Sequence, residues 1–375
     1  MRKRLESNNH KAFFALLRAG LWEQDVKLLS YKTLDLSVVY SLAQEQTVVG
    51  IVASGLEHVS DTRLHKDSVL LFVGDALQME QRNTAMNNLI SVLVDKLKDA
   101  GVNILLVKGQ GIAQCYARPL WRSCGDVDFL VDDNHYERAK QVLLELSEVK
   151  AVEVDNRKHL ELNIQGWVVE LHGSLRGYVL GRIDKGIDNI LTDIFSKNKV
   201  RVWQNGSTPV YLPAPDEDVV LVFAHILQHF TQGGIGLRQV CDWCRLLWVY
   251  RDTLDYELLE SRIRGMGIMT EWKAFGSLAV DFLGMPNKDM PFYSSDNKWN
   301  RKANRLMEFI LMTGNMGHNR DFSYSERHSY LISKFISLWW HTTDALEHFR
   351  IFPLDSIMIW GNLVTRRSKV ALKGE

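Results

Sequence analysis

The sequence predicts an α+β protein in which a small mixed sheet, within residues 101–213, is flanked by helical regions over residues 1–100 and 214–375. Two observations lead to this prediction. In both outer regions, apolar residues recur at the three- and four-residue spacing of amphipathic helices, without strand-like alternation. In the middle region, the pattern changes to short apolar runs separated by glycine, proline and charged residues, which is typical of strands.

Composition limits the class of protein. Hydrophobic residues make up 46% and charged residues 24% of the 375 positions, as in ordinary globular proteins with two or three domains. Lysine plus arginine equals aspartate plus glutamate at 45 each, so no overall positive charge attracts nucleic acid. No apolar run approaches the ~18 residues that span a bilayer, and the basic N-terminus lacks a signal-peptide cleavage site. We therefore expect a cytoplasmic protein with no membrane segment and no strong general affinity for nucleic acids.

Three helices are predicted in the N-terminal region, over residues 11–29, 36–58 and 75–99. The third helix carries its leucines on one stripe, and Gly101 follows it directly. Glycine commonly ends a helix because it adopts left-handed backbone angles without strain. The boundary between the helical region and the sheet region is therefore expected at about residue 100.

The middle region alternates strands with helices and then forms a hairpin. The predicted elements are a strand over 103–107, a helix over 112–116, a strand over 125–131, a helix over 136–146 and strands over 159–164 and 167–171. Gln165 and Gly166 form the tight turn between the last two strands. These elements predict a small mixed sheet covered by helices.

Helices resume after Pro213 and Pro215. Three acidic residues, 216–218, precede an apolar helix over 219–230, and acids are favourable in the first turn of a helix. Residues 232–236 are rich in glycine and form a loop. Further helices are predicted over residues 237–250, 256–264, 270–282, 298–312 and 325–349.

The strand over 125–131 carries the strongest chemical signal. Asp126 and Asp128 are separated by one residue, so their side chains point to the same face of the strand while Val127 and Phe129 point into a core. Two carboxylates held together require positive charge, and Mg²⁺ or Mn²⁺ supplies it in many phosphoryl-transfer sites. The alternative is a solvated strand end. The apolar flanks and the presence of a third acid favour the metal site.

The third acid of this site is predicted to be Glu170. It follows the apolar residues 167–169 on a later strand, where metal ligation or deprotonation of an acceptor hydroxyl as a general base explains a carboxylate, and pairing with an arginine is the alternative. Asp155, Glu153 and Glu161 are rival candidates for the same role. Asp126, Asp128 and Glu170 are thus the predicted catalytic and metal-binding residues.

A phosphate-binding segment is predicted where the first strand ends. Lys108 is followed by Gly109, Gln110 and Gly111, and both an ammonium group and exposed backbone amides attract phosphate. The segment is not a P-loop, because the G-x-x-x-x-G-K pattern is absent, and a lysine beside a turn is the alternative. Arg122, four residues before Asp126, can neutralise either the carboxylates or a triphosphate.

Two pairs of potential metal ligands lie in the C-terminal region. His225 and His229 share one face of a helix, but the glutamate of a zinc-protease motif is missing, so we interpret His225 as a core residue and His229 as lining a cleft. Cys241 and Cys244 form a C-x-x-C without evident further ligands. They are interpreted as buried thiols in a reducing compartment.

These motifs resemble the uncharacterised nucleotidyltransferase family of the polymerase-beta-like superfamily. In that family, an L-K-G strand end precedes the signature Y-x-x-P-x-x-R-x-x-G-D-[IV]-D-[LF]-L-V, and a later strand carries [DE]-x-H. Most of the superfamily has Gly-Ser where this chain has Lys108 and Gly109. The resemblance extends from about residue 30 to 250, and the matching residues are Lys108, Gly109, Arg122, Asp126, Asp128, Glu170, His172, His225, His229, Arg238 and Asp242.

The resemblance implies a polymerase-beta-like nucleotidyltransferase domain between the helical regions. It implies nucleotide binding by Lys108, Gly109, Gln110 and Arg122. It also implies a helical domain that closes over the site, with an acceptor cleft lined by His172, His229, Arg238 and Asp242.

We therefore expect an enzyme that uses Mg²⁺ or Mn²⁺ to transfer a nucleoside monophosphate from a nucleoside triphosphate to a hydroxyl acceptor. The acceptor, whether small molecule, protein or RNA, is not defined by the sequence. Two alternatives stay open: a non-catalytic binding module that retains the fold, and a toxin that adds nucleotides to RNA.

Overall fold

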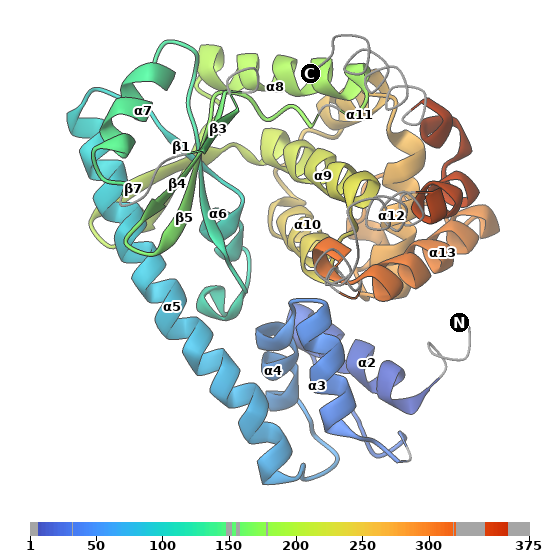
Figure 1. The fold of residues 1–375 in the computed structure, drawn as a ribbon. Coiled ribbons are helices and arrows are strands. Elements are labelled where there is room, and N and C mark those ends of the chain that lie inside the picture. The colour runs from blue at the N-terminus through green and yellow to red at the C-terminus, as the bar shows by residue number, and fades with distance from the viewer. Residues whose placement is uncertain are drawn as a thin grey trace, which may run out of the picture.

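The computed structural model describes residues 7–31, 33–147, 152–154, 158–177, 179–317, 319 and 342–358. Within these residues the chain is an α+β protein in which helical regions precede and follow a small mixed sheet in the sequence, as predicted (Figure 1). No helix among the described residues is both long enough and apolar enough to cross a membrane.

The N-terminal region contains four helices, α2 (Asn8–Trp22), α3 (Leu36–Glu45), α4 (Val49–Glu57) and α5 (Lys66–Asp99). The helix predicted over 36–58 is two helices, because Thr47 between them adopts a positive φ of 54° that no α-helix contains. The helix predicted over 11–29 ends at Trp22, whereas α5 starts before the predicted residue 75. Gly101 has a φ of 74° and ends α5 as predicted.

The main sheet has five strands in the order β1-β2-β5-β4-β3. Only β2 and β5 run parallel, and the other neighbours are antiparallel. Gln165 and Gly166 have φ values of 54° and 75°, which two-residue hairpin turns of type I′ require. The strands are β1 (Leu105–Val107), β2 (Asp126–Leu130), β3 (Val152–Val154), β4 (His159–Ile164) and β5 (Trp167–His172).

Helices and a second hairpin surround this sheet. Short elements precede and follow β2, namely α6 (Gly109–Ala113), η1 (Pro119–Trp121) and α7 (Tyr136–Leu144). The sequence analysis assigned no element between residues 172 and 213, where the structure has α8 (Gly181–Lys197) and the two-stranded hairpin of β6 (Val200–Asn205) and β7 (Thr208–Pro213).

The C-terminal region is helical, and its predicted helices agree with the structure to within a few residues. Residues 342–351 are also helical, and the rest of the helix predicted over 325–349 lies outside the described residues. The elements are α9 (Pro215–Gln232), α10 (Leu237–Tyr250), α11 (Tyr256–Gly265), α12 (Met269–Asp281), η3 (Asn287–Asp289), α13 (Asn297–Thr313) and η4 (Asn315–Gly317).

Two hydrophobic cores hold these elements together. The first joins the N-terminal helices to the C-terminal helices, for example through Phe13, Phe72 and Phe223. The second packs the sheet against the C-terminal half of α5, through residues such as Leu93 and Phe129. Because α5 contributes to both cores, this one continuous helix connects the helices of the first core to the sheet (Figure 1). The four cysteines of the chain are buried free thiols.

Candidate active site

The three predicted acids lie side by side on two neighbouring strands. Asp126 and Asp128 project from one face of β2, while Val127 and Phe129 are buried on the opposite face. In the parallel pairing of β2 with β5, Asp128 stands directly opposite Glu170. The sheet therefore brings the Asp-x-Asp pair and the later acid to a single patch.

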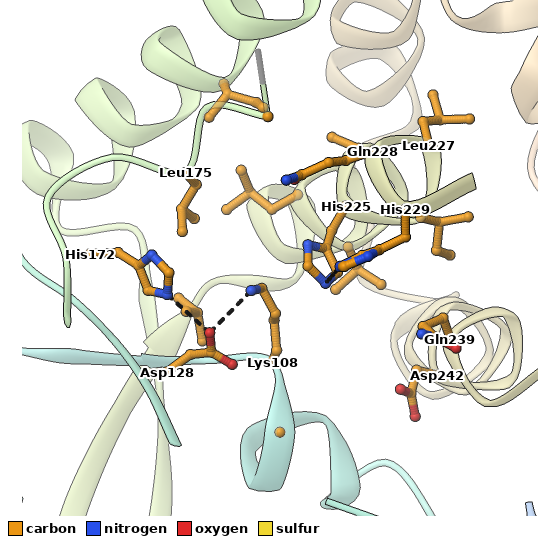
Figure 2. Close-up of a pocket in the computed structure, with 18 of the residues that line it drawn as sticks. Lys108, Asp128, His172, Leu175, His225, Leu227, Gln228, His229, Gln239 and Asp242 are labelled. Carbon is orange, nitrogen blue, oxygen red and sulfur yellow. Dashed lines mark hydrogen bonds and ion pairs between the residues drawn. The ribbon is translucent and has the colours of Figure 1, made fainter. Parts of the chain in front are cut away.

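Basic side chains surround Asp128. Lys108 Nζ lies 3.1 Å and His172 Nε2 lies 3.0 Å from the same oxygen, Asp128 Oδ1 (Figure 2). His172 Nε2 is also 3.2 Å from Glu170 Oε2, and His159 Nε2 is 3.1 Å from that oxygen. Asp126, in contrast, makes no hydrogen bond or ion pair through its carboxylate within the described part of the chain.

These contacts set the charges of the three acids. Burial opposes ionisation of Asp128, but Lys108 and His172 outweigh it and lower its pKa. Burial likewise opposes ionisation of Glu170, and hydrogen bonds from His159 and His172 lower its pKa. Burial, together with the charge of Asp128, raises the pKa of Asp126. The patch therefore holds one carboxylate, that of Asp126, whose ionisation its surroundings disfavour and which no side chain of the described residues binds.

Lys108 reaches Asp128 through an unusual backbone conformation. It follows β1 with φ 58° and ψ −144°, a region that residues other than glycine rarely occupy and that costs about 1–3 kcal/mol. Gly109 continues with a positive φ of 42°. Such strain persists where the surrounding structure requires it, and here it directs the ammonium group to the acids.

Gln110, predicted to bind nucleotide, points elsewhere. Its side-chain nitrogen donates a 2.8 Å hydrogen bond to Asn83 Oδ1 on α5, and the side chain is buried there. Lys108 and Gly109 line the cavity beside the acids, whereas Gln110 does not.

The acids form part of the wall of a cavity of about 460 Å³. Figure 2 shows Lys108, Asp128 and His172 on one side of it and His225 and His229 of α9 facing them. Between β5 and α9 the wall is largely apolar, and it is formed by Leu175, Val179, Ile183, Ile187, Leu221 and Val222. The cavity thus combines a charged end with an apolar end, as many small-molecule sites do.

His225 and His229 form a hydrogen-bonded pair on the cavity wall, with their Nε2 atoms 3.0 Å apart. The interpretation of His225 as a core residue was wrong, because it lines the cavity and is only partly buried. Burial and the charge of Lys108 lower the pKa of His225 well below its usual value, and the same two causes, with Arg238, lower the pKa of His229 to about 4. Both imidazoles are therefore neutral at pH 7.

Arg122 and Asp242 are bound to each other. Arg122 Nε and Nη2 donate to the two carboxylate oxygens of Asp242 at 3.0 and 2.6 Å, and Tyr116 Oη donates to Asp242 Oδ1 at 2.8 Å. Both charged side chains are buried. Arg238 lies next to them, with Nη1 3.9 Å from Asp242 Oδ2 and 3.3 Å from the carbonyl oxygen of Ser123. A buried ion pair thus connects the segment before β2 to α10.

The sequence analysis missed His159 as a member of the site. A two-residue turn at Gln165 and Gly166 fixes the register of β4 and β5, so it places His159 opposite His172. The register could have been read from the turn. Of the rival acids, Glu161 stands opposite Glu170 and is exposed, while the side chains of Glu153 and Asp155 lie outside the described residues.

Comparisons with known proteins show which family the chain belongs to. No curated protein matches the sequence. Among solved structures, the chain is similar to an antigenic nucleotidyltransferase-like protein from Paracoccidioides brasiliensis, with 14% identity and a TM-score of 0.31 over 48% of this chain and 86% of that chain. A similarity of this degree says nothing about the substrate. The model of a family described as uncharacterised nucleotidyltransferase matches residues 32–284, more than half of the chain and all of the site residues above, and the chain therefore belongs to that family.

Proposed function

We propose that the chain transfers a nucleoside monophosphate from a nucleoside triphosphate to a hydroxyl group, with a divalent ion held by Asp126, Asp128 and Glu170. One observation carries the proposal. The three carboxylates lie on adjacent parallel strands at a cavity, and the carboxylate of Asp126 has no hydrogen-bond or ion-pair partner among the described residues. Paired acids of this kind hold the metal ions of phosphoryl transfer.

The donor set fits Mg²⁺ or Mn²⁺. Lys108 and His172 both bind Asp128 Oδ1, and the histidines bind Glu170 Oε2, so within the described residues no hydrogen bond occupies Asp128 Oδ2 or Glu170 Oε1. Each of the three acids thus retains an oxygen for a metal ion, and oxygen is the ligand that Mg²⁺ prefers. When bound, the ion would neutralise charge on the phosphate groups.

The residues of the chain supply position and charge. The Lys108 ammonium group would approach the phosphate oxygens, where a charged hydrogen bond is worth about 1.5–3 kcal/mol. The acceptor hydroxyl would meet the wall formed by His225 and His229, whose neutral imidazoles can accept a hydrogen bond from it. In the reaction the acceptor hydroxyl would give its proton to a neutral imidazole of this wall, and its oxygen would bond to the α-phosphorus. The bond from that phosphorus to the oxygen bridging the α and β phosphates would break, and pyrophosphate would leave.

Two predicted site residues have a different part in this proposal. Arg122 and Asp242 also line the cavity, but because they bind each other we propose that they fix α10 against the segment before β2. Arg238 and His172 line the cavity as well. We propose that Arg238 lies within reach of the acceptor and His172 within reach of the acids.

The test is transfer of label from each α-labelled triphosphate, with Mg²⁺ and cell extract, into protein, RNA or small-molecule fractions. We expect the wild-type chain to label one fraction, and Asp126→Asn and Asp128→Asn to abolish the labelling. Asp133→Asn is the matched control, since Asp133 follows the strand and pairs with Lys158 at the surface. If no triphosphate binds at millimolar concentration, the proposal falls and a non-catalytic binding module replaces it.

A further inference from the structure

A second group of metal ligands adjoins the three acids. His159 Nε2 and His172 Nε2 lie 3.1 and 3.2 Å from one oxygen, Glu170 Oε2, and the three ligand atoms are all within 4.8 Å of one another. Ligand atoms that share an ion at the ~2.0–2.1 Å of zinc coordination lie about 3 Å apart. The spacing of the two nitrogens from this oxygen is therefore already that of a coordinated set.

We infer that His159, Glu170 and His172 bind a first-row transition-metal ion such as Zn²⁺. This site differs from the oxygen site of Asp126, Asp128 and Glu170 in its two nitrogen ligands. Glu170 belongs to both ligand sets. The inference concerns metal binding alone and does not depend on the transfer reaction.

The strands hold these three residues in place. His159 on β4 stands directly opposite His172 on the antiparallel β5, and their rings stack with centroids 4.8 Å apart. Leu160, Val169 and Leu171, which alternate with them, are buried on the other face of the sheet. A preformed site on rigid strands loses little conformational entropy when an ion binds.

The charge of the patch suits a divalent cation. The three carboxylates of Asp126, Asp128 and Glu170 outnumber the two nearby cations, the Lys108 ammonium group and the Arg238 guanidinium group, so the patch stays negative when the imidazoles are neutral. Asp128 Oδ1, 3.0 Å from His172 Nε2, is an additional oxygen donor. The Lys108 ammonium group on that same oxygen opposes binding of the ion. The Asp126 carboxylate, which no described residue binds, offsets this effect.

The ligand types decide which ion binds. Imidazole nitrogen favours Zn²⁺, Co²⁺ and Ni²⁺, whereas Mg²⁺ takes oxygen ligands almost exclusively. The competing explanation of the same geometry is that protonated histidines serve as counter-ions to the acids. In that case the two histidines would bind no ion at all.

The experiment is titration of the full chain with Co²⁺, followed by visible absorption and by calorimetry. We expect one Co²⁺ site, which Zn²⁺ displaces and Mg²⁺ does not. His159→Asn should weaken Co²⁺ binding by at least about tenfold, since changes even to groups that merely orient ligands cost that much. Mg²⁺ affinity should fall much less in this variant, because His159 is not a ligand of the oxygen site and contacts only one of its three acids, Glu170.

Two controls locate the ion. His58→Asn removes a surface histidine that is also paired with a glutamate, Glu23, and should leave Co²⁺ binding intact. His225→Asn breaks the other close histidine pair of the cavity. Co²⁺ binding that His225→Asn abolishes and His159→Asn does not would overturn the inference, as would the absence of Co²⁺ binding to the wild-type chain.

A variant that gains an absorption band distinguishes the loss of a metal ligand from misfolding of the variant. His159→Cys exchanges a nitrogen ligand for a thiolate and should add a thiolate-to-Co²⁺ charge-transfer band, which a misplaced side chain cannot produce. Absence of this band in a folded His159→Cys protein that still binds Co²⁺ would contradict the assignment. Neither outcome bears on triphosphate labelling in Mg²⁺, so the proposed transfer reaction succeeds or fails separately.

Discussion

Asp242→Asn should destabilise the protein far more than an equal change at the surface. The Asp242 carboxylate accepts two hydrogen bonds from Arg122 and one from Tyr116, and the Arg122 side chain is 3% exposed. Burial disfavours the guanidinium charge, and the Asp242 carboxylate is the main cause that keeps the pKa of Arg122 above its usual value. Removing one partner of such a buried pair costs about 3–5 kcal/mol, because the other charge is left without compensation.

Asp188→Asn provides the matched comparison. Asp188 accepts the same two-pronged contact from Arg176, at 2.7 and 2.5 Å, but both side chains are more than one third exposed. An exposed pair contributes only about 0.2–1 kcal/mol. Urea denaturation followed by tryptophan fluorescence measures both free energies of unfolding. A loss for Asp242→Asn no larger than that for Asp188→Asn would refute the reasoning.

A double variant separates charge from packing. Arg122→Met with Asp242→Leu removes both charges at once, so it should be more stable than Asp242→Asn alone. Equal instability of the single and double variants would show that packing around the pair, rather than the unpaired charge, determines the cost.

Three further predictions concern charge. Lys108→Met should weaken triphosphate binding by about tenfold or more in equilibrium dialysis, because one charged hydrogen bond is lost; unchanged affinity would remove Lys108 from the binding site. His229, whose pKa burial and Lys108 lower to about 4, should show constant imidazole NMR shifts from pH 6 to 8; a titration in that range would contradict the assigned environment. Burial and the charge of Asp355 raise the pKa of Glu271 to about 8, from 4.5. The folded state then holds a proton that the unfolded chain releases, so the free energy of unfolding should fall from pH 5 to 8 and level off above it. Glu271→Gln should remove this fall.

Local sequence patterns were sufficient for much of the fold. The helices α10 and α11 lie within a residue of their predicted bounds, because each carries a clear apolar face and ends at turn residues. The alternation in β2 and β5 placed Asp126, Asp128 and Glu170 on strands, and the register of the sheet then set Asp128 opposite Glu170.

Helix α8 and the hairpin of β6 and β7 also have sequence patterns from which they could have been predicted. Helix α8 has isoleucines at 183, 187, 190 and 194, which is the spacing of one helical face. The hairpin of β6 and β7 turns at Gly206 and Ser207, a pair typical of two-residue hairpin loops.

Tertiary partners could not be predicted from local patterns. Arg122 and Asp242 are 120 residues apart, so nothing near Arg122 in the sequence reveals that its guanidinium is already bound. Gln110 follows Lys108 and Gly109 in the predicted phosphate segment, yet α6 turns its side chain to Asn83. In both cases the packing of distant elements decides which way a polar side chain points.

The reactivity of the buried thiols can be used to measure transient opening of the folded chain. Burial raises the pKa of Cys115 to about 12 and raises the pKa values of Cys124, Cys241 and Cys244 as well. In the folded state at neutral pH these thiols are therefore protonated and inaccessible to an alkylating reagent. Modification must wait for the surrounding structure to open, and mass spectrometry can count it cysteine by cysteine. The alkylation rate of Cys124 then reports the opening of the structure beside β2, and that of Cys241 reports the opening of α10, without an introduced label.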